Sequence, residues 1–170
     1  MRCIVITRPD FIEGEAAAIE TMLASGVIDR VHIRKPGAQE SAVRRLIEAV
    51  APSLRSRLSL HDCHVLAAEY GAGVHLNSRN SALPPGFSGI VSRSCHSLEE
   101  AETPADYRFL SPVFDSISKT GYRAAFNLEE LIGKVDDTFV ALGGVMPERL
   151  PLLARTGFGG AAFLGYIWDG

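Results

Sequence analysis

The chain has 170 residues and lacks several features that would place it outside the ordinary globular class. No apolar run reaches the roughly 18 residues that span a bilayer, and the N-terminus lacks the basic, apolar and small-residue order of a signal peptide. A cytoplasmic location is therefore expected by default. Cys3, Cys63 and Cys95 are odd in number and lie far apart without a C-x-x-C pair. This usage argues against a disulfide framework and against a structural zinc site.

An excess of basic residues is also missing. The formal net charge is -3, and acidic and basic residues are interleaved, so no basic stripe is available to neutralise a nucleic-acid backbone. The sequence also has no G-x-G-x-x-G after its first β-rich run, which disfavours a dinucleotide-binding site. We therefore expect neither nucleic acid nor membrane as a partner.

What the sequence does contain is a regular alternation of two patterns. Short β-rich runs occupy residues 3–7, 31–33, 58–60, 73–76, 89–92, 107–110, 138–142 and 159–164. Helical patterns or helix-length loops separate them. The clearest helix places four apolar residues on one face and stops before Pro52; they are Val43, Leu46, Ile47 and Val50.

Repeated βα units predict a parallel sheet, and eight of them predict a closed barrel. The expected fold is a single domain over residues 1–170, a compact (β/α)8 TIM barrel. Because about 200 to 250 residues are usual for this fold, we expect trimmed helices and a last helix that is missing or truncated. A doubly wound open sheet is the alternative.

Local signals predict how three of the helices begin. Ser97 and Glu100 match the S-x-x-E capping box, and Asn127 with Glu130 offers a second cap. Pro147 suits the first turn of a helix, whereas Pro151 inside the same pattern is expected to delay or bend that helix.

In a parallel barrel the residues that follow the strands meet at one mouth, where active sites lie. Many polar residues occupy such positions here, among them Arg34, Lys35, His61, Asp62, Asn77, Asn80, Ser94 and His96. This concentration favours an enzyme over an inert barrel.

Two oxyanion sites are predicted at the same mouth. The loop at 110–121 combines turn residues with Ser116, Ile117, Ser118 and Lys119, and hydroxyls beside a lysine suit phosphate. Gly143 and Gly144, with Leu164 and Gly165, would expose backbone N–H groups after the last two strands. A ligand with two phosphorylated ends would fit these sites.

Several segments together resemble a known family. They are Arg34, His61-Asp62, Gly73-Val74-His75-Leu76, Ser94 through Ala101, Ala105-Asp106-Tyr107, Ser111-Pro112-Val113-Phe114 through Lys119, and Leu142-Gly143-Gly144. In this order they are similar to the thiamine phosphate synthase and thiazole tautomerase (TenI) family. The resemblance implies a phosphate-binding barrel and a transferase of thiamine biosynthesis. Such a synthase joins hydroxymethylpyrimidine diphosphate to thiazole phosphate and releases pyrophosphate with the help of Mg²⁺.

The resemblance also implies roles for individual residues. Arg34 matches the arginine of the family's Q-x-R-x-K signature, while His32 replaces its glutamine and Pro36 stands at its lysine. With His32 and His61, Lys35 is counted among the residues that bind substrate. Lys35 is displaced by one residue from the family's lysine, however, and on an extended chain such a shift turns the side chain away. Ser116, Ser118 and Lys119 stand where the family has Thr, Thr and Lys near the pyrophosphate.

The implied metal site is altered in this chain. Asp62 keeps a magnesium aspartate, whereas Asn80 stands where the second is expected and His61 stands where the family has asparagine. Mg²⁺ would still bind through Asp62, water and the diphosphate itself. Ser94 is implied to hold the pyrimidine.

His96 matches a histidine that resembles the general acid/base of the tautomerases, and an imidazole suits proton transfer near neutral pH. A tautomerase that uses His96 is therefore one alternative, and a non-catalytic relative that binds thiazole phosphate is another. His75 is expected to be a core histidine. The absence of an H-x-H spacing disfavours a transition-metal site built from His32, His61, His75 and His96. A homo-oligomer is left open.

Overall fold

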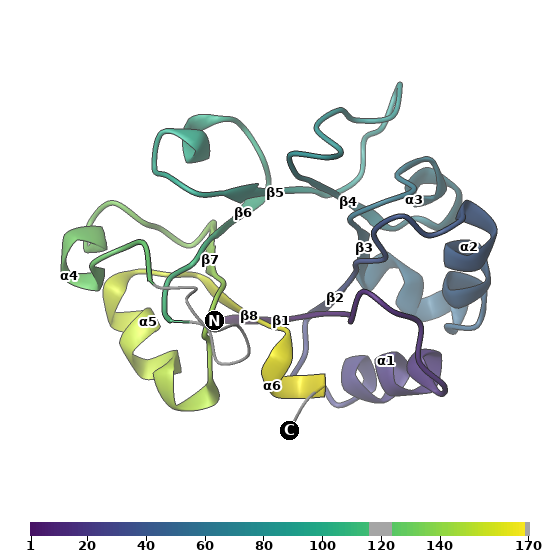
Figure 1. Ribbon diagram of the computed structural model, residues 1–170, viewed down its shortest axis with the longest axis horizontal. Helices are drawn as coiled ribbons and strands as arrows, with labels where there is room; N and C mark the ends of the chain where they lie inside the picture. The colour runs from purple at the N-terminus through teal and green to yellow at the C-terminus, as the bar shows by residue number, and fades with distance from the viewer. Residues whose placement is uncertain (116–123, 169–170) are drawn as a thin grey trace. The chain divides into compact units, whose positions relative to one another are not determined.

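Figure 1 shows a computed structural model of the protein, which describes residues 1–115 and 124–168. Eight strands follow one another in the closed order of a barrel. They are β1 (Arg2–Ile6), β2 (Arg30–Ile33), β3 (Leu58–Leu60), β4 (Gly73–Leu76), β5 (Val91–Cys95), β6 (Tyr107–Leu110), β7 (Phe139–Ala141) and β8 (Gly160–Phe163). The pairs β2–β3, β3–β4, β5–β6, β6–β7 and β7–β8 are parallel. The predicted (β/α)8 class is confirmed.

The helical segments between the strands are short. The α-helices are α1 (Glu15–Ala24), α2 (Glu40–Glu48), α3 (Val65–Tyr70), α4 (Leu128–Leu131), α5 (Leu150–Thr156) and α6 (Gly165–Trp168). The described residues also include three 3-10 segments: η1 (Pro52–Arg57), η2 (Glu100–Glu102) and η3 (Pro147–Arg149). In the part of the chain that the structure describes, no helix has the length and apolar character to cross a membrane.

The chain forms two compact units, and the boundary runs through β1. The N-terminal unit consists of Val5–Val91, and the C-terminal unit combines Met1–Ile4 with Ser92–Gly170. The polar residues that follow β2, β3 and β4 belong to the first unit, and those that follow β5, β6, β7 and β8 belong to the second.

In the N-terminal unit, β2, β3 and β4 pair so that Val31 lies beside Leu58 and Leu60 lies beside Val74. All four side chains are fully buried. Figure 1 shows α1 and α2 on the outer side of β2 and β3. The predicted apolar face of α2 is confirmed, because Val43, Leu46 and Ile47 are buried.

In the C-terminal unit, an apolar cluster fills the space between β5–β8 and the segments outside them. It includes Cys95, Leu110, Phe139, Leu153 and Phe163. The expected effect of Pro151 is confirmed: α5 begins only at Leu150, so the proline lies in the first turn, where its missing N–H is not needed.

Two local expectations are corrected. The strand expected at 89–92 runs from Val91 to Cys95, because its pairing with β6 continues to the end of that strand. The capping box at 97–100 forms only in part. Glu100 N donates to Ser97 Oγ, but the Glu100 carboxylate accepts from His96 N (2.7 Å), and only the short η2 follows. The cap by Asn127 is confirmed, since its side chain accepts from Glu129 N at the start of α4.

Candidate active site

Residues at the ends of β1 and β2 hold Arg34, the first basic residue of the candidate site in the N-terminal unit. Thr7 N donates to His32 O, and Thr7 Oγ1 accepts from Arg34 N, both at 2.9 Å. These bonds hold the backbone at the residue where β2 ends. The Arg34 side chain is partly buried there; burial and the nearby charge of Arg79 lower its pKa, and the carboxylate of Asp62 opposes this effect. Because an arginine starts from so high a pKa, Arg34 remains a cation.

Asp62 follows β3 and supplies the carboxylate of this site. Its Oδ2 accepts from Lys35 N (3.2 Å), and its Oδ1 accepts from Asn80 Nδ2 (3.0 Å). Arg79 Nη2 lies 3.7 Å from the same Oδ1. The Asp62 side chain keeps 13% of its surface exposed. It is thus held from two sides and still reachable by a ligand.

The loop after β4 is shaped by Asn77. Its Oδ1 accepts from the backbone N–H groups of Arg79 (2.9 Å) and Asn80 (3.1 Å), which closes a tight turn. Its Nδ2 and the Nδ2 of Asn80 both donate to His61 O. This turn clamps the loop onto the end of β3 and places Arg79 beside Asp62.

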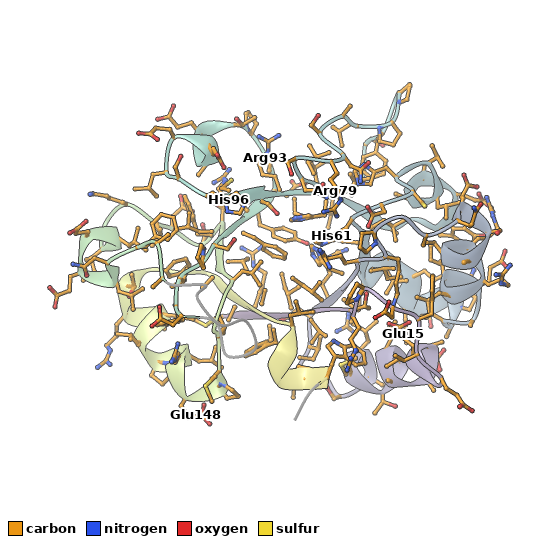
Figure 2. The ribbon with its side chains drawn as sticks, in the orientation of Figure 1. Glu15, His61, Arg79, Arg93, His96 and Glu148 are labelled. Carbon is orange, nitrogen blue, oxygen red and sulfur yellow. The ribbon has the colours of Figure 1, made fainter. Side chains whose placement is uncertain are left out.

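Arg79 is the residue of this set that sequence reasoning missed. It is half-exposed. Figure 2 labels it in the same part of the N-terminal unit as His61, whereas Glu15 is the first residue of α1. The sequence does show a basic residue between Asn77 and Asn80. Whether that residue reaches Asp62 depends on the tight turn at Asn77, which the sequence pattern did not specify.

Lys35 was expected to bind substrate, but its ammonium group is directed elsewhere. The side chain is fully buried, and Nζ donates to Glu15 Oε1 (2.6 Å), Arg8 O (2.9 Å) and Asp10 O (2.7 Å). All three donors of the group are thereby used. Only the backbone N–H of Lys35 contributes to the site, through its bond to Asp62.

Three histidines converge beneath these residues. His32 comes from β2, His61 follows β3, and His75 lies in β4, and all three are buried. His32 Nδ1 lies 2.9 Å from His61 Nε2, and the rings of His61 and His75 are stacked with centroids 3.9 Å apart. Burial above all, and then the charge of His75, lowers the pKa of both His32 and His61 well below the usual value. The two imidazoles are therefore neutral at pH 7.

In the C-terminal unit, His96 directly follows β5. Its side chain is exposed, and Nδ1 lies 3.0 Å from Ser111 O. A carbonyl oxygen can only accept, so Nδ1 carries the proton and Nε2 of the neutral ring presents a lone pair. This is the form that a general base needs. Ser94, which was expected beside it, lies within β5 opposite Phe109 and is partly buried.

The segment after β7 makes a sharp turn at two glycines. Gly143 and Gly144 have φ of 93° and 59°, in the left-handed region that favours glycine. A Cβ on Gly144 would lie 2.1 Å from Asp115 O. Glycine is therefore required here by both conformation and space. Arg149 holds the turn, since its Nη1 donates to Gly144 O at 2.9 Å.

The segment after β6 packs against this turn. Val113 N donates to Leu142 O (2.9 Å), and Phe114 N donates to Gly143 O (3.1 Å). Asp115 Oδ1 accepts from Ala124 N (2.7 Å). The predicted phosphate residues Ser116, Ile117, Ser118 and Lys119 lie outside the described residues. Leu164 directly follows β8, and Gly165 is the first residue of α6.

Comparison with known proteins agrees with this arrangement. Residues 3–167 match the family described as thiamine monophosphate synthase (TMP-TENI). The chain belongs to this family. The thiamine-phosphate synthase of Rhodospirillum centenum is 28% identical over 186 residues, which cover 99% of this chain and 89% of that protein. The thiamine-phosphate synthase of Yersinia pestis is 30% identical over 166 residues, covering 88% of this chain and 77% of the relative.

Solved structures extend the likeness to three dimensions. The thiamine phosphate pyrophosphorylase from Bacteroides thetaiotaomicron superimposes with a TM-score of 0.86 at 34% identity, covering 99% of this chain and 85% of that one. The thiamine phosphate pyrophosphorylase from Pyrococcus furiosus, at 24% identity and a TM-score of 0.77, supports the fold. The suspected family membership and the thiamine-biosynthesis class of transferase are confirmed.

Proposed function

We propose that this protein is a thiamine-phosphate synthase. It joins hydroxymethylpyrimidine diphosphate to thiazole phosphate: the thiazole nitrogen forms a bond to the pyrimidine methylene, and the carbon–oxygen bond to the diphosphate breaks. Pyrophosphate departs with the electron pair of that bond. The substrates are thus small phosphorylated molecules, and the expected location is the cytoplasm. Family membership supports the class of reaction. One observation on this chain supports where the diphosphate binds and how its departure is stabilised.

That observation is the charge arrangement after β2, β3 and β4. One partly exposed carboxylate, Asp62, lies 3.7 Å from the Arg79 guanidinium and interacts electrostatically with that of Arg34. The set carries a net positive charge, which suits a diphosphate with its several negative oxygens. The leaving group gains negative charge as the bond breaks, so cations held in place here stabilise the transition state more than the ground state.

The donor set also fits Mg²⁺. A single carboxylate together with the oxygens of a bound diphosphate is a common way to hold this ion. Asp62 and the side-chain oxygen of Asn80 would hold it, because the Asn80 nitrogen is already used in bonds to Asp62 and His61 O. When bound, the ion would neutralise charge on the departing pyrophosphate.

The C-terminal unit supplies the remaining proposed contacts. The backbone N–H groups of Gly143, Gly144 and Gly165 would bind the phosphate of the thiazole, with Leu164 beside them. Ser94 would hold the pyrimidine, and Ser116, Ser118 and Lys119 would contact the pyrophosphate. Support comes from the glycine turn, whose two left-handed residues are of the kind that forms anion-binding concavities.

Incubation of the protein with both phosphorylated substrates and Mg²⁺ tests the proposal. The expected result is thiamine phosphate and one equivalent of pyrophosphate per turnover, with a large loss of rate in Asp62→Asn. The matched control is Asp137→Asn, an exposed aspartate of the other unit, which should keep the wild-type rate. No product above background at high enzyme concentration would overturn the synthase proposal.

The orientation of His96 favours a second candidate function. With Nδ1 bonded to Ser111 O, Nε2 is placed to take a proton from a small ligand. This geometry suits the tautomerase reaction on thiazole carboxylate phosphate. Metal-independent turnover of that compound, lost in His96→Ala, would support this function. If neither assay gives product but thiazole phosphate raises the Tm, the chain is a binding protein of the same family.

A further inference from the structure

We propose that His32, His61 and His75 form a binding site for a divalent transition metal ion of the zinc class. The three side chains present nitrogens that all lie within 4.8 Å of one another. His32 and His75 are fully buried, and His61 is 5% exposed. This site is separate from the proposed Mg²⁺ position, which is built from oxygen ligands.

The convergence of these rings is the first reason to assign them a ligand. The ring centroids of His32, His61 and His75 lie 3.9 to 5.2 Å apart, so each imidazole faces the other two. Imidazole is the commonest metal ligand in proteins, and one ion accepts a lone pair from each of three such rings.

The present geometry is close to what such an ion needs. Zinc–nitrogen bonds of about 2.0–2.1 Å in a tetrahedral site place ligand nitrogens about 3.3 Å apart. His32 Nδ1 and His61 Nε2 are now 2.9 Å apart, as in a hydrogen bond, and no ligand pair exceeds 4.8 Å. Small ring rotations and a change of tautomer therefore convert the cluster into a three-histidine site.

The chemistry of the donors selects the ion. A site with only imidazole ligands suits Zn²⁺, Co²⁺, Ni²⁺ or Cu²⁺, whereas Mg²⁺ and Ca²⁺ require oxygen. Three protein ligands leave a fourth position open. The positive charges of Arg30 and Arg34 act on His32 and His61, so a negatively charged fourth ligand, such as hydroxide, is favoured.

The strand positions make the cluster rigid. In the register of β2 with β3, His32 lies opposite Ser59. Ser59 is two residues before His61 in the sequence. The backbone of His75 is fixed from outside, since His64 Nε2 lies within hydrogen-bond distance of its carbonyl oxygen (3.1 Å). His32 and His75 lie on strands, and His61 directly follows one. Ligands held on strands keep their geometry better than ligands on loops, which favours a specific ion.

Cobalt titration of the untagged full-length protein, after treatment with EDTA, tests the proposal. We expect one Co²⁺ per chain, with the visible absorption of a tetrahedral nitrogen site, and displacement of Co²⁺ by one equivalent of Zn²⁺. Saturation with Zn²⁺ should also raise the Tm. The measurement uses no substrate, so its failure would leave the proposed synthase activity untouched, and the reverse also holds.

Four variants make the assignment specific. His32→Gln and His61→Asn each remove one ligand and should weaken Co²⁺ binding by at least about 10²-fold. His96→Gln removes a histidine outside the cluster, and Cys63→Ser removes the thiol two residues after His61 in the sequence. Both variants should bind Co²⁺ as the wild type does. A Tm measured without metal shows that each ligand variant is folded.

Absence of stoichiometric binding to the wild type would overturn the proposal. So would unchanged binding in both folded ligand variants, or loss of binding in Cys63→Ser, which would place the ion on a thiolate.

Discussion

Arg34 and Lys35 are neighbours at the end of β2, yet the fold uses their positive charges in opposite ways. The Arg34 guanidinium stands with Asp62 and Arg79, where side chains are partly exposed, while the Lys35 ammonium is fully buried against Glu15. Side chains of consecutive residues on an extended chain point to opposite sides. One cation is therefore available to a ligand, and the other connects β2 to the segment that precedes α1. The pair shows that charge at a barrel mouth is not by itself a sign of substrate binding.

The strongest way to break this comparison is to remove the partner of the buried cation. Glu15→Ala leaves the Lys35 ammonium buried without its counter-ion, and breaking such a pair costs about 3–5 kcal/mol of unfolding free energy. Urea unfolding followed by circular dichroism measures this loss. The control is Arg44→Ala, which breaks the exposed ion pairs to Glu40 and Glu69 and should cost far less, because solvent screens exposed charges. Equal losses in the two variants would contradict the structural role of Lys35.

Removing the accessible cation should affect activity instead. Arg34→Ala is expected to lower kcat/KM for the pyrimidine diphosphate about 10²-fold, because a positioned charge on the leaving group is lost. Steady-state kinetics with the second substrate saturating measures the change. The unfolding free energy should stay within about 1 kcal/mol of the wild type, as expected for a partly exposed charge. A stability loss as large as that of Glu15→Ala, with unchanged kcat/KM, would exchange the roles assigned to the two cations.

The buried histidines extend the comparison to pH. His32 and His61 have pKa values well below 6.5 in the folded chain, so below about pH 6.5 the unfolded chain binds protons that the folded chain does not. The free energy of unfolding should therefore fall as the pH drops below 6.5, by up to about 1.4 kcal/mol per pH unit for each histidine. Urea unfolding in EDTA at pH 7.5, 6.5 and 5.5 measures it. Between pH 6.5 and 5.5, the double variant His32→Gln with His61→Asn should lose less unfolding free energy than the wild type. An identical pH dependence in the two proteins would refute this explanation.

The smallest effect is expected at Arg79. Its side chain is 49% exposed, and its Nη2 lies 3.7 Å from Asp62 Oδ1, beyond hydrogen-bond distance. We therefore expect it to hold a diphosphate less rigidly than Arg34. Arg79→Ala should raise KM for the pyrimidine diphosphate about three- to tenfold, equivalent to about 1 kcal/mol, with little change in kcat. Arg79→Lys should recover part of the loss. A variant with unchanged KM would place Arg79 outside the site.

The sequence predicts the strands and the polar positions after them, because both depend on local pattern. Residues 58–60 and 73–76 match β3 and β4 without change, and Asp62 and Asn80 come together as expected. The direction of Lys35 follows from simple alternation along an extended strand, and the sequence argument had already noted this turn away from the site. The buried partner Glu15, however, is 20 residues distant, so no local pattern identifies it.

Two other features depend on long-range geometry. Arg79 reaches Asp62 only because Asn77 closes a tight turn, and the meeting of His32, His61 and His75 depends on the register of three strands. The capping signal at 97–100 fails in part for a local reason, since the Glu100 carboxylate bonds to His96 N, one residue before the expected partner Ser97 N. Where a side chain has several possible hydrogen-bond or ion-pair partners, only the folded structure shows which one it bonds.

The most direct test of the account is the binding of pyrophosphate to the residues that follow β2, β3 and β4 in the N-terminal unit. Calorimetric titration of pyrophosphate, with and without Mg²⁺, should be done on the wild type and on Asp62→Asn. We predict that Mg²⁺ strengthens binding to the wild type and has little effect on the variant, because Asp62 is the carboxylate that we propose holds the ion. The same effect of Mg²⁺ on both proteins, or no binding of pyrophosphate to the wild type, would contradict the account.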